Sequence, residues 1–451
     1  MLLASDRSRF DDPRCGISNT LIDLYQCWLD IVMAHAGETA LTELATKRCW
    51  TFEELRRGTE SLPCESSATM AFPSGRGVEF IFAMLRAWRN AKVTCPLEPG
   101  AMPPRIPAPP HSVVHLKITS GSTGATKCIA FTAEQLVADV EAIVKGMGMG
   151  LDTINLGVIS LAHSYGFSNL VLPLFLHGIP LILAPNPLPG SIVEAVRFAG
   201  PARLTIPAVP AMWRAWHEVH ALPPQGTLAI SAGAALAETL ESAIFAASGL
   251  KIHNFVGASE CGGILFDSSS TPRPATGFAG RPLPGVEILR DTDGCLEIRS
   301  GAVAETYWPN PDPSLGHGTY RSRDLVEISP EGGVSLKGRA DDLINIAGRK
   351  VAPEAIEIVL RRHPAVRECL VLGVPDASYR GESVVAVVEL TEPRSESDLR
   401  DFVRATLPEW QTPKIWQFVS QLNPGERGKF SRAEWRERIS TRTGMFRDGA
   451  N

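Results

Sequence analysis

The residues best suited to chemistry in this chain lie between Ile118 and Cys128, where the sequence reads ITSGSTGATKC. Hydroxyl residues and glycines lead there to a single lysine, Lys127, directly after an apolar stretch. Small residues let backbone N–H groups approach an anion closely, and hydroxyls add hydrogen-bond donors in little space. The lysine adds a point charge for phosphate. The run therefore predicts a loop that binds a polyphosphate such as ATP.

The spacing of this loop excludes one common phosphate-binding motif. A Walker A loop reads Gly-x-x-x-x-Gly-Lys-Ser/Thr, whereas Lys127 stands three residues after Gly124. Taken alone, the run also fits a flexible surface loop, because short motifs of this kind often occur by chance. The rest of the chain has to decide between the two interpretations.

Four further clusters carry groups that a nucleotide-using site needs. Residues 254–260 (NFVGASE) follow a predicted strand and place a hydroxyl and a carboxylate at its carboxyl end, which suits a Mg²⁺–nucleotide site. Asp324 could accept hydrogen bonds from ribose hydroxyls. Arg339 and Asp341 stand at a proposed domain boundary, and Lys429 lies on a glycine-bearing loop near the carboxyl end. Each of these could also be an ordinary turn or surface residue.

The elements that must position these residues alternate between strand and helix. Short apolar runs predict buried strands at 157–161, 181–183, 204–206, 228–231 and 252–256. A capping box at Ser191 predicts a helix that ends at Gly200, and an apolar stripe from Leu236 to Ala247 predicts another that ends at Gly249. This alternation indicates an α/β fold with doubly wound, mostly parallel sheets.

Composition divides the chain into further parts. Seven prolines within 96–110 predict an extended connector after a helix-rich first subdomain at 1–110. After residue 280, turn signals between short strands predict a small β subdomain. We therefore expect an N-terminal region at 1–338 and a separate C-terminal α+β domain at 339–451. The elements expected in that domain are helices at 355–362 and 397–406 and strands near 369–372, 384–388 and 416–419.

Overall composition excludes several classes of protein. The net charge of −5 comes without a basic block, so nucleic acid is not an expected partner. Nine cysteines without a Cys-x-x-Cys pair suit neither a zinc site nor a disulfide framework. No signal peptide is indicated at the start, and the most apolar window, 171–184, is interrupted by Pro173 and Pro180, too short to span a bilayer. We expect a cytoplasmic protein.

Together and in this order, the clusters resemble the acyl-adenylate-forming superfamily of acyl- and aryl-CoA synthetases, free-standing adenylation domains and firefly luciferase. The resemblance runs from about Trp50 to Arg432. It implies that the phosphate loop wraps the ATP phosphates through Thr119, Ser120, Gly121, Ser122, Thr123 and Lys127. It implies that the adenine lies along Gly233, Ala234, Asn254 and Phe255.

The resemblance implies roles for the remaining cluster residues as well. Ser259 would touch the α-phosphate, and Glu260 would hold Mg²⁺. The ribose would lie beside Asp324 and Arg339. Lys429 would reach the α-phosphate and the carboxylate during adenylation. Asp341 would be the hinge about which the C-terminal domain turns. Gly348 and Lys350 would line the channel through which a thin pantetheine arm brings its thiol.

Several positions depart from the superfamily pattern. They are Thr126 in place of proline, Cys128 in place of glycine, Val256 in place of tyrosine, Arg323 in place of glycine and Asn345 in place of the lysine of many relatives. The connector before the phosphate loop is also short, so the first subdomain is abbreviated. None of these departures removes a charged catalytic group.

The segment Leu161–Phe167 corresponds to the acid-binding segment of the resembling synthetases. It holds His163 and no aspartate that could bind an α-ammonium group, so we expect a non-amino acid, aryl or medium-chain aliphatic. His163 is then a pocket wall or a contact for the carboxylate, and we count it among the catalytic residues. Residues 261–263 (CGG) either leave room for a bulky acyl group or allow tight packing.

The expected reaction is ATP-dependent activation of this acid to an acyl-adenylate with release of pyrophosphate, followed by transfer to a thiol. The cofactors implied are ATP, Mg²⁺ and coenzyme A. No carrier domain is appended, so coenzyme A is the first candidate acceptor and a separate acyl carrier protein the second. A further alternative is an inactive relative that binds nucleotide or acyl ligand, against which Glu260, Asp324, Arg339 and Lys429 argue.

Overall fold

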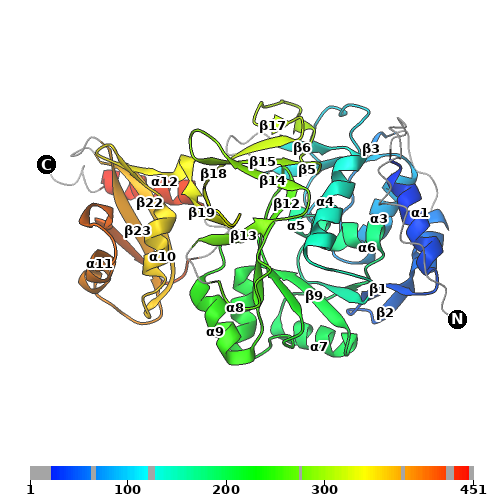
Figure 1. Ribbon diagram of the computed structural model, residues 1–451, viewed down its shortest axis with the longest axis horizontal. Coiled ribbons are helices and arrows are strands. Elements are labelled where there is room, and N and C mark those ends of the chain that lie inside the picture. Colours follow the sequence, from blue (N-terminus) through cyan, green and yellow to red (C-terminus); the bar gives the residue numbers. More distant parts are fainter. Residues whose placement is uncertain are drawn as a thin grey trace.

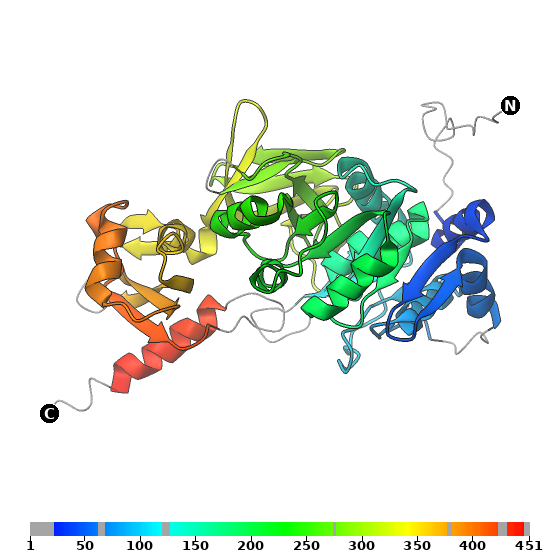
Figure 2. The same ribbon diagram turned by 90° about the horizontal axis from the view of Figure 1, so that it is seen from below.

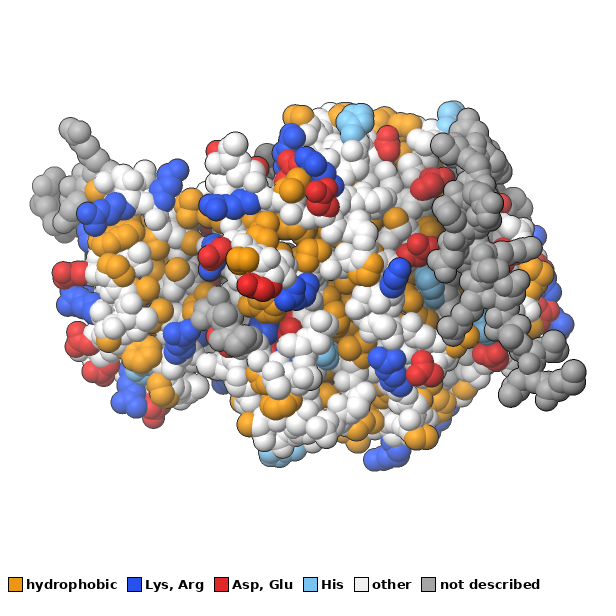
Figure 3. All heavy atoms as spheres, viewed as in Figure 1, with side chains coloured by type: hydrophobic (Ala, Val, Ile, Leu, Met, Phe, Trp, Pro, Cys, Tyr) orange, Lys and Arg blue, Asp and Glu red, His pale blue; other side chains and the backbone are white. Residues whose placement is uncertain are grey.

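A computed structural model of the chain describes residues 22–61, 68–119, 127–273, 277–376, 381–422 and 431–445. Figures 1 and 2 show an elongated molecule, with the first helices at one end and a smaller α+β part at the other. Among the described residues, no helix is long and apolar enough to cross a membrane. Acidic and basic side chains are interspersed on the face shown in Figure 3.

The centre of the main body is a set of parallel strands. They run in the order β11, β10, β9, β7, β8 and β1, and β2 pairs antiparallel at the edge. Their bounds are Thr39–Glu43 for β1, Arg48–Thr51 for β2, Thr153–Gly157 for β7, Leu181–Leu183 for β8, Arg203–Ala208 for β9, Leu228–Ser231 for β10 and Ile252–Ala258 for β11. The parallel sheet predicted from the apolar runs is confirmed.

Helices cover both faces of this sheet (Figure 1). One face packs on α7 (Pro189–Ala199), α8 (Pro210–Glu218) and α9 (Glu238–Ser248). The other packs on α1 (Leu24–His35), α4 (Ala133–Gly146) and α6 (Leu172–His177). Neighbouring strand residues divide between the two cores, as Ala229 and Ile230 do, because successive side chains point to opposite faces. The sheet is therefore doubly wound.

Two local predictions were wrong in position. The strand expected at 157–161 is β7, which ends at Gly157. The prediction was displaced because β7 buries the polar residues Thr153 and Asn155, which interrupt its apolar run. Helix α7 begins at Pro189, a favoured first helical residue, and not at a capping box on Ser191. The Ser191 hydroxyl instead donates to Asn186 Oδ1, 2.8 Å away.

A second sheet carries the arms of the phosphate loop. Its order is β16 (Thr306–Trp308), β6 (Lys127–Phe131), β5 (His115–Thr119), β4 (Val93–Thr94) and β3 (Met70–Ala71). Helix α2 (Phe52–Ser61) precedes β3 in the chain, and α3 (Val78–Arg89) lies between β3 and β4. Residues 101–110 form neither helix nor strand, as the prolines predict.

A β region was predicted after residue 280, and the structure begins it earlier, with the strand that follows β11. It contains β12 (Gly262–Phe266), β13 (Phe278–Pro282), β14 (Val286–Arg290), β15 (Cys295–Ser300), β17 (Leu315–Gly316), β18 (Thr319–Ile328) and β19 (Val334–Arg339). Strand β13 pairs with both β12 and β19, so this region continues the main sheet through hydrogen bonds.

The C-terminal part has a sheet and a core of its own. Its elements are η2 (Ala340–Asp342), β20 (Ile344–Ile346), β21 (Arg349–Val351), α10 (Pro353–Leu360), β22 (Val366–Asp376), β23 (Gly381–Leu390), α11 (Glu396–Arg404), β24 (Ile415–Val419) and α12 (Arg432–Met445). The sheet runs β22, β23, β24, with α10 and α11 in one apolar cluster and α12 in another. The α+β class is confirmed, and the boundary at 338/339 stays a prediction.

Candidate active site

Glu260 lies in the turn between β11 and β12, at the carboxyl end of a parallel strand. Its Oε1 atom accepts a hydrogen bond of 3.0 Å from the Tyr307 hydroxyl, and its backbone carbonyl accepts one of 2.9 Å from the Ala304 N–H. Burial, reinforced by the neighbouring Glu260 carboxylate, raises the pKa of Tyr307, so this phenol stays a donor. The predicted Mg²⁺ ligand is therefore held by residues of the other sheet.

Tyr307 also meets the predicted phosphate-binding lysine. The Lys127 ammonium lies 3.5 Å from the centre of the Tyr307 ring, close enough for a cation–π contact. Its second neighbour is the Asp312 carboxylate, 3.8 Å away. One tyrosine thus brings Lys127 and Glu260 together, although 133 residues separate them in the sequence.

The sequence contains no motif that singles out Tyr307. Its place depends on β16 pairing with β6, in which Tyr307 lies opposite Ile129. That pairing becomes visible only in the folded chain, because it joins segments far apart in the sequence. We therefore count Tyr307 as a site residue that motif analysis missed.

The hairpin formed by β5 and β6 carries the phosphate loop at its tip. Thr119 ends β5, and its backbone pairs with that of Lys127 at the start of β6. The predicted loop residues Ser120, Gly121, Ser122 and Thr123 lie outside the described residues, as does Lys429. Their roles stay predictions.

The predicted acid-binding segment meets the predicted nucleotide segment at two serines. The Ser164 hydroxyl donates to the Ser259 hydroxyl over 3.0 Å. Beside it, the exposed His163 caps the short helix α5 (Ser164–Gly166), and its Nδ1 atom accepts from the Tyr165 N–H at 3.3 Å. Because Nδ1 accepts, the neutral ring carries its proton on Nε2. His163 can therefore present an N–H group to an anion.

A stacked aromatic pair forms a second junction between these segments. The rings of Tyr165 and Phe255 lie 6.0 Å apart, centre to centre. The Tyr165 hydroxyl donates to the carbonyls of Ala208 and Ile230, each at 3.4 Å, and burial raises its pKa well above the ordinary value. The resemblance puts Phe255 and Asn254 together beside the adenine. Because consecutive strand residues point to opposite faces, Phe255 is buried against Tyr165 on the face of β11 away from the Asn254 side chain.

The two segments expected along the adenine follow neighbouring strands. Gly233 and Ala234 lie in the loop after β10, and Gly233 has φ +85°, a conformation that favours glycine. Asn254 lies in β11, where its side-chain N–H donates to the Ala279 carbonyl over 2.8 Å. Because β10 and β11 pair in parallel, their carboxyl ends reach the same edge of the sheet.

The glycines after Glu260 serve tight packing, which decides between the two interpretations of residues 261–263. A Cβ on Gly262, whose φ is +66°, would collide with the carboxylate of Asp139 in α4. A Cβ on Gly263 would come within 2.7 Å of Leu283. The Asp139 carboxylate accepts a hydrogen bond from the Gly263 N–H over 2.9 Å and another from the Ser168 hydroxyl over 2.6 Å. The small residues therefore let β12 approach α4.

The predicted ribose and hinge residues form two ion pairs with neighbouring residues in the middle of β18. Asp324 pairs with Arg339 at 3.5 Å, across the register of β18 and β19. Arg323, where the superfamily pattern has glycine, pairs with Asp341 at 2.9 Å. This departure therefore adds a contact to the predicted hinge, one that motif comparison alone did not reveal.

The predicted thiol-channel residues lie on the hairpin that follows the hinge. Gly348 has φ +90° and donates its N–H to Asn345 Oδ1 over 2.9 Å, and Lys350 is exposed on β21. A Cβ on Gly348 would meet no atom within 4 Å. The turn thus needs glycine for its backbone conformation. The thiol-channel role stays a prediction.

A single carboxylate such as Glu260 fits a magnesium ion that would bind together with its nucleotide. Within the described ranges, no group of three or more His, Cys, Asp or Glu side chains is placed to hold a metal ion. Magnesium in nucleotide sites is commonly held by one or two carboxylates together with substrate phosphates. Glu260, joined through Tyr307 to Lys127 at the start of β6, would supply one such carboxylate.

The chain is similar to several known ligases. A sulfoacetate–CoA ligase from Cupriavidus necator is 27% identical over 377 residues, covering 76% of this chain and 70% of the relative. A benzoate–CoA ligase from Thauera aromatica is 28% identical over 345 residues, 70% of this chain and 64% of the relative. Enterobactin synthase component E from Escherichia coli is 28% identical over 365 residues, 74% of this chain and 66% of the relative. The chain thus spans about two thirds of each relative's length.

Solved structures share the fold. ATP-bound MatB from Rhodopseudomonas palustris superposes with a TM-score of 0.80 at 21% identity, over 93% of this chain and 99% of the other. Residues 37–308 match the family of AMP-binding enzymes, and residues 355–429 match the AMP-binding enzyme C-terminal domain. The chain belongs to the AMP-binding enzyme family.

Proposed function

We propose that this enzyme activates a non-amino carboxylic acid with ATP, releases pyrophosphate, and transfers the acyl group from the adenylate to a thiol. The observation that carries this proposal is the meeting of Lys127, Tyr307 and Glu260 beside the Ser164–Ser259 contact. A cation for phosphate, a carboxylate for magnesium and the acid-binding segment thus converge on one place. Those are the groups that adenylation requires.

The reacting groups explain the choice of side chains. Attack of a carboxylate on the α-phosphate brings two anions together, so the developing charge must be neutralised. Magnesium, when bound with the nucleotide, supplies part of that charge. Glu260 would hold the ion, Lys127 would bind the outer phosphates, and Lys429 would reach the α-phosphate.

On the acid side, we propose His163 as the group that orients the substrate. Its Nδ1 atom accepts from the Tyr165 N–H, so the donor of the neutral ring is Nε2–H. A hydrogen bond from Nε2 to one carboxylate oxygen would leave the other oxygen to attack phosphorus. Ser259, fixed by Ser164, would contact the α-phosphate.

The side chains near this segment support an uncharged acyl group. Tyr165 of this segment is aromatic and only partly buried, and the segment contains no carboxylate that could bind an ammonium group. Aromatic side chains pack well against aryl and aliphatic groups. We therefore propose an aryl or medium-chain aliphatic acid.

Coenzyme A is the acceptor that we propose first. The similar proteins include CoA ligases as well as a 2,3-dihydroxybenzoate–AMP ligase, which is 25% identical to this chain over 376 residues. A separate acyl carrier protein is the second candidate acceptor. In that case, the same adenylate would pass to a phosphopantetheine thiol.

A screen of acids tests the proposal. Pyrophosphate release is measured with ATP, Mg²⁺ and aryl, short, medium and long carboxylic acids. Formation of an acyl thioester is then measured with coenzyme A and with phosphopantetheinylated carrier protein. We expect release with an aryl or medium-chain acid and none with the Lys429→Ala variant. No release with any acid would favour an inactive ligand-binding relative.

A further inference from the structure

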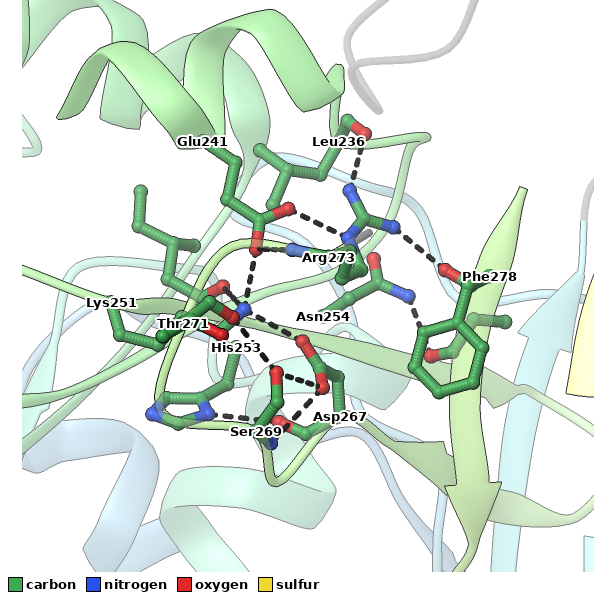
Figure 4. Close-up of polar contacts among 12 residues, drawn as sticks. Leu236, Glu241, Lys251, His253, Asn254, Asp267, Ser269, Thr271, Arg273 and Phe278 are labelled. Atoms are coloured by element: carbon green, nitrogen blue, oxygen red, sulfur yellow. Dashed lines mark hydrogen bonds and ion pairs between the residues drawn. The ribbon is translucent and has the colours of Figure 1, made fainter. Parts of the chain in front are cut away.

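A buried cluster of four charged residues lies next to the two proposed adenine segments (Figure 4). The side chains of Glu241, Lys251, Asp267 and Arg273 are 0%, 7%, 2% and 5% exposed. Two positive and two negative charges balance, so the cluster is neutral as a whole. They come from α9, the residue before β11, and the segment after β12.

Three members of the cluster satisfy one another's polar atoms. The Lys251 ammonium donates to Glu241 Oε1, to Asp267 Oδ2 at 2.6 Å and to its neighbour's carbonyl at Ile252, 2.9 Å away. Asp267 Oδ1 accepts from the Ser269 hydroxyl at 2.7 Å. Burial alone would raise the pKa of Asp267, but the hydrogen bonds from Lys251 and Ser269 outweigh it and lower the pKa.

Arg273 differs from the other three because its side chain donates to backbone carbonyls of two separate segments, the loop after β10 and strand β13. Its Nε atom donates to Glu241 Oε2 at 2.7 Å, which fixes the plane of the guanidinium. Nη2 donates to the Leu236 carbonyl at 2.7 Å, and Nη1 donates to the Phe278 carbonyl at 2.9 Å. Figure 4 shows the guanidinium between these two carbonyls.

The two carbonyls lie in segments that are joined to the proposed adenine-binding residues. Leu236 ends the loop that contains Gly233 and Ala234, and Phe278 begins β13. The next residue of β13, Ala279, accepts the side-chain hydrogen bond of Asn254. Arg273 and Asn254 therefore tie the loop after β10 and the strand β11 to the same short stretch of backbone.

Stability alone is a weak reason for such a cluster. Removing two charges from water costs several kcal/mol per ion, and well-packed apolar residues often replace a buried ion pair without loss. A planar guanidinium with its donors in a rigid fork does something that apolar residues cannot, since it fixes two carbonyls in a set direction.

We infer that Arg273 is a positioning residue for the nucleotide: it holds the loop of Gly233 and Ala234 at a fixed distance from β11 and thereby sets the affinity for the adenine base. This inference rests on the proposed function, because it takes the two segments as the walls of the adenine site. Arg273 itself touches no substrate.

The test is an Arg273→Lys variant, which keeps the charge and loses the fork. The Kd for ATP is measured by calorimetry, and KM for ATP and for the acid are measured in the pyrophosphate assay. We expect the Kd and KM for ATP to rise about tenfold, because the variant loses one or two hydrogen bonds to the backbone. KM for the acid should change less than twofold.

A matched control is Arg361→Lys. Arg361 is also largely buried and also holds a carboxylate, Glu368 at 2.8 Å, and a carbonyl, Cys369 at 3.1 Å, but it lies in the C-terminal part. Its replacement should lower thermal stability without changing the Kd for ATP. An equal rise in the Kd for ATP in both variants would mean a general structural effect and would overturn the inference.

A second variant covers the case that Arg273→Lys does not fold. The double replacement Glu241→Met, Arg273→Met removes one opposite pair and leaves Lys251 bound to Asp267. It should again raise the Kd for ATP about tenfold, because both carbonyls lose their donor. Unchanged ATP affinity in either folded variant would overturn the inference. A wild-type protein that binds no ATP would instead overturn the proposed function.

Discussion

At the scale of single residues, Glu260 decides whether the site uses magnesium as proposed. Replacement by glutamine keeps an oxygen that can accept from the Tyr307 hydroxyl, so the local fold should persist. The charge that would hold the ion is lost. We expect the Mg²⁺ concentration for half-maximal pyrophosphate release to rise at least about tenfold, as when a metal-binding group is weakened.

The control for this replacement is Tyr307→Phe. It removes the hydroxyl that orients Glu260 and keeps the ring beneath Lys127. Its Mg²⁺ titration should shift less than that of Glu260→Gln. An unchanged titration for Glu260→Gln would remove this residue as a magnesium ligand.

Lys117 makes a residue-scale prediction about stability. Its side chain is 4% exposed, lies 4.4 Å from the centre of the Phe131 ring, and has no hydrogen-bond partner among the described residues. Burial lowers its pKa, and the nearby Asp139 only partly opposes this. A charged ammonium in this place destabilises the folded chain, so Lys117→Met should stabilise it by about 1–3 kcal/mol at pH 7.

The pH dependence of that gain has a definite sign. The pKa of Lys117 is lower in the folded than in the unfolded chain, so the folded chain releases its proton first as pH rises. The wild type therefore becomes more stable relative to Lys117→Met above the folded pKa. Urea unfolding at pH 7 and near pH 10 should show a gain that shrinks at the higher pH. A gain of equal size at both pH values would contradict this account.

The sequence predicted some residue positions and missed others for a physical reason. Glu260, Asp324 and Arg339 could be proposed as site residues because each stands in a short motif, and their roles stay predictions. Tyr307 and the Ser164–Ser259 contact were missed, because both depend on segments that meet only in the folded chain. Short motifs report local sequence, whereas a site is completed by distant pairings.

At the scale of elements, the close approach of β12 to α4 depends on Gly262. Its φ of +66° is unfavourable for any other residue, and a Cβ would collide with the Asp139 carboxylate. Gly262→Ala should cost at least about 2 kcal/mol, the usual range for overpacking plus backbone strain. Gly37→Ala is the control, because a Cβ on Gly37 meets no atom within 4 Å.

Urea unfolding of both variants checks this prediction. Gly37→Ala should stay within about 0.5 kcal/mol of the wild type, as surface substitutions do. A Gly262→Ala protein of unchanged stability would show that α4 can move away, and would reopen the interpretation of residues 261–263 as space for the acyl group.

The elements themselves were predictable where the apolar pattern was uninterrupted. Strand β10 was predicted with its observed bounds, and α9 ends at Gly249, which adopts φ +70° as expected after a helix. Strand β7 was displaced because it buries Asn155, whose side chain donates to the Asn169 carbonyl over 3.0 Å. Periodicity cannot reveal such a residue, because its burial depends on a partner in another element.

At the scale of the whole molecule, exposed ion pairs hold the C-terminal part where it lies. Arg367 of β22 pairs with Glu218 of α8 at 3.6 Å, and Arg323 pairs with Asp341 at 2.9 Å. All four side chains are about half exposed. Such pairs contribute about 0.2–1 kcal/mol each, so they bias an orientation and cannot lock it. That suits a C-terminal domain that turns about the predicted hinge at Asp341 between the two half-reactions.

Glu218→Lys tests this whole-molecule proposal. The lysine would face Arg367 and disfavour the present orientation by about 1 kcal/mol, which shifts a two-state equilibrium roughly fivefold. If the two half-reactions use different orientations, pyrophosphate release and thioester formation should change in opposite directions. Salt at about 0.5 M should remove most of the difference, because exposed charges are screened.

Glu287→Lys, which makes the same charge change beside Arg299 within the main body, should leave both rates unchanged. Equal changes in both half-reactions of Glu218→Lys would contradict a turning domain.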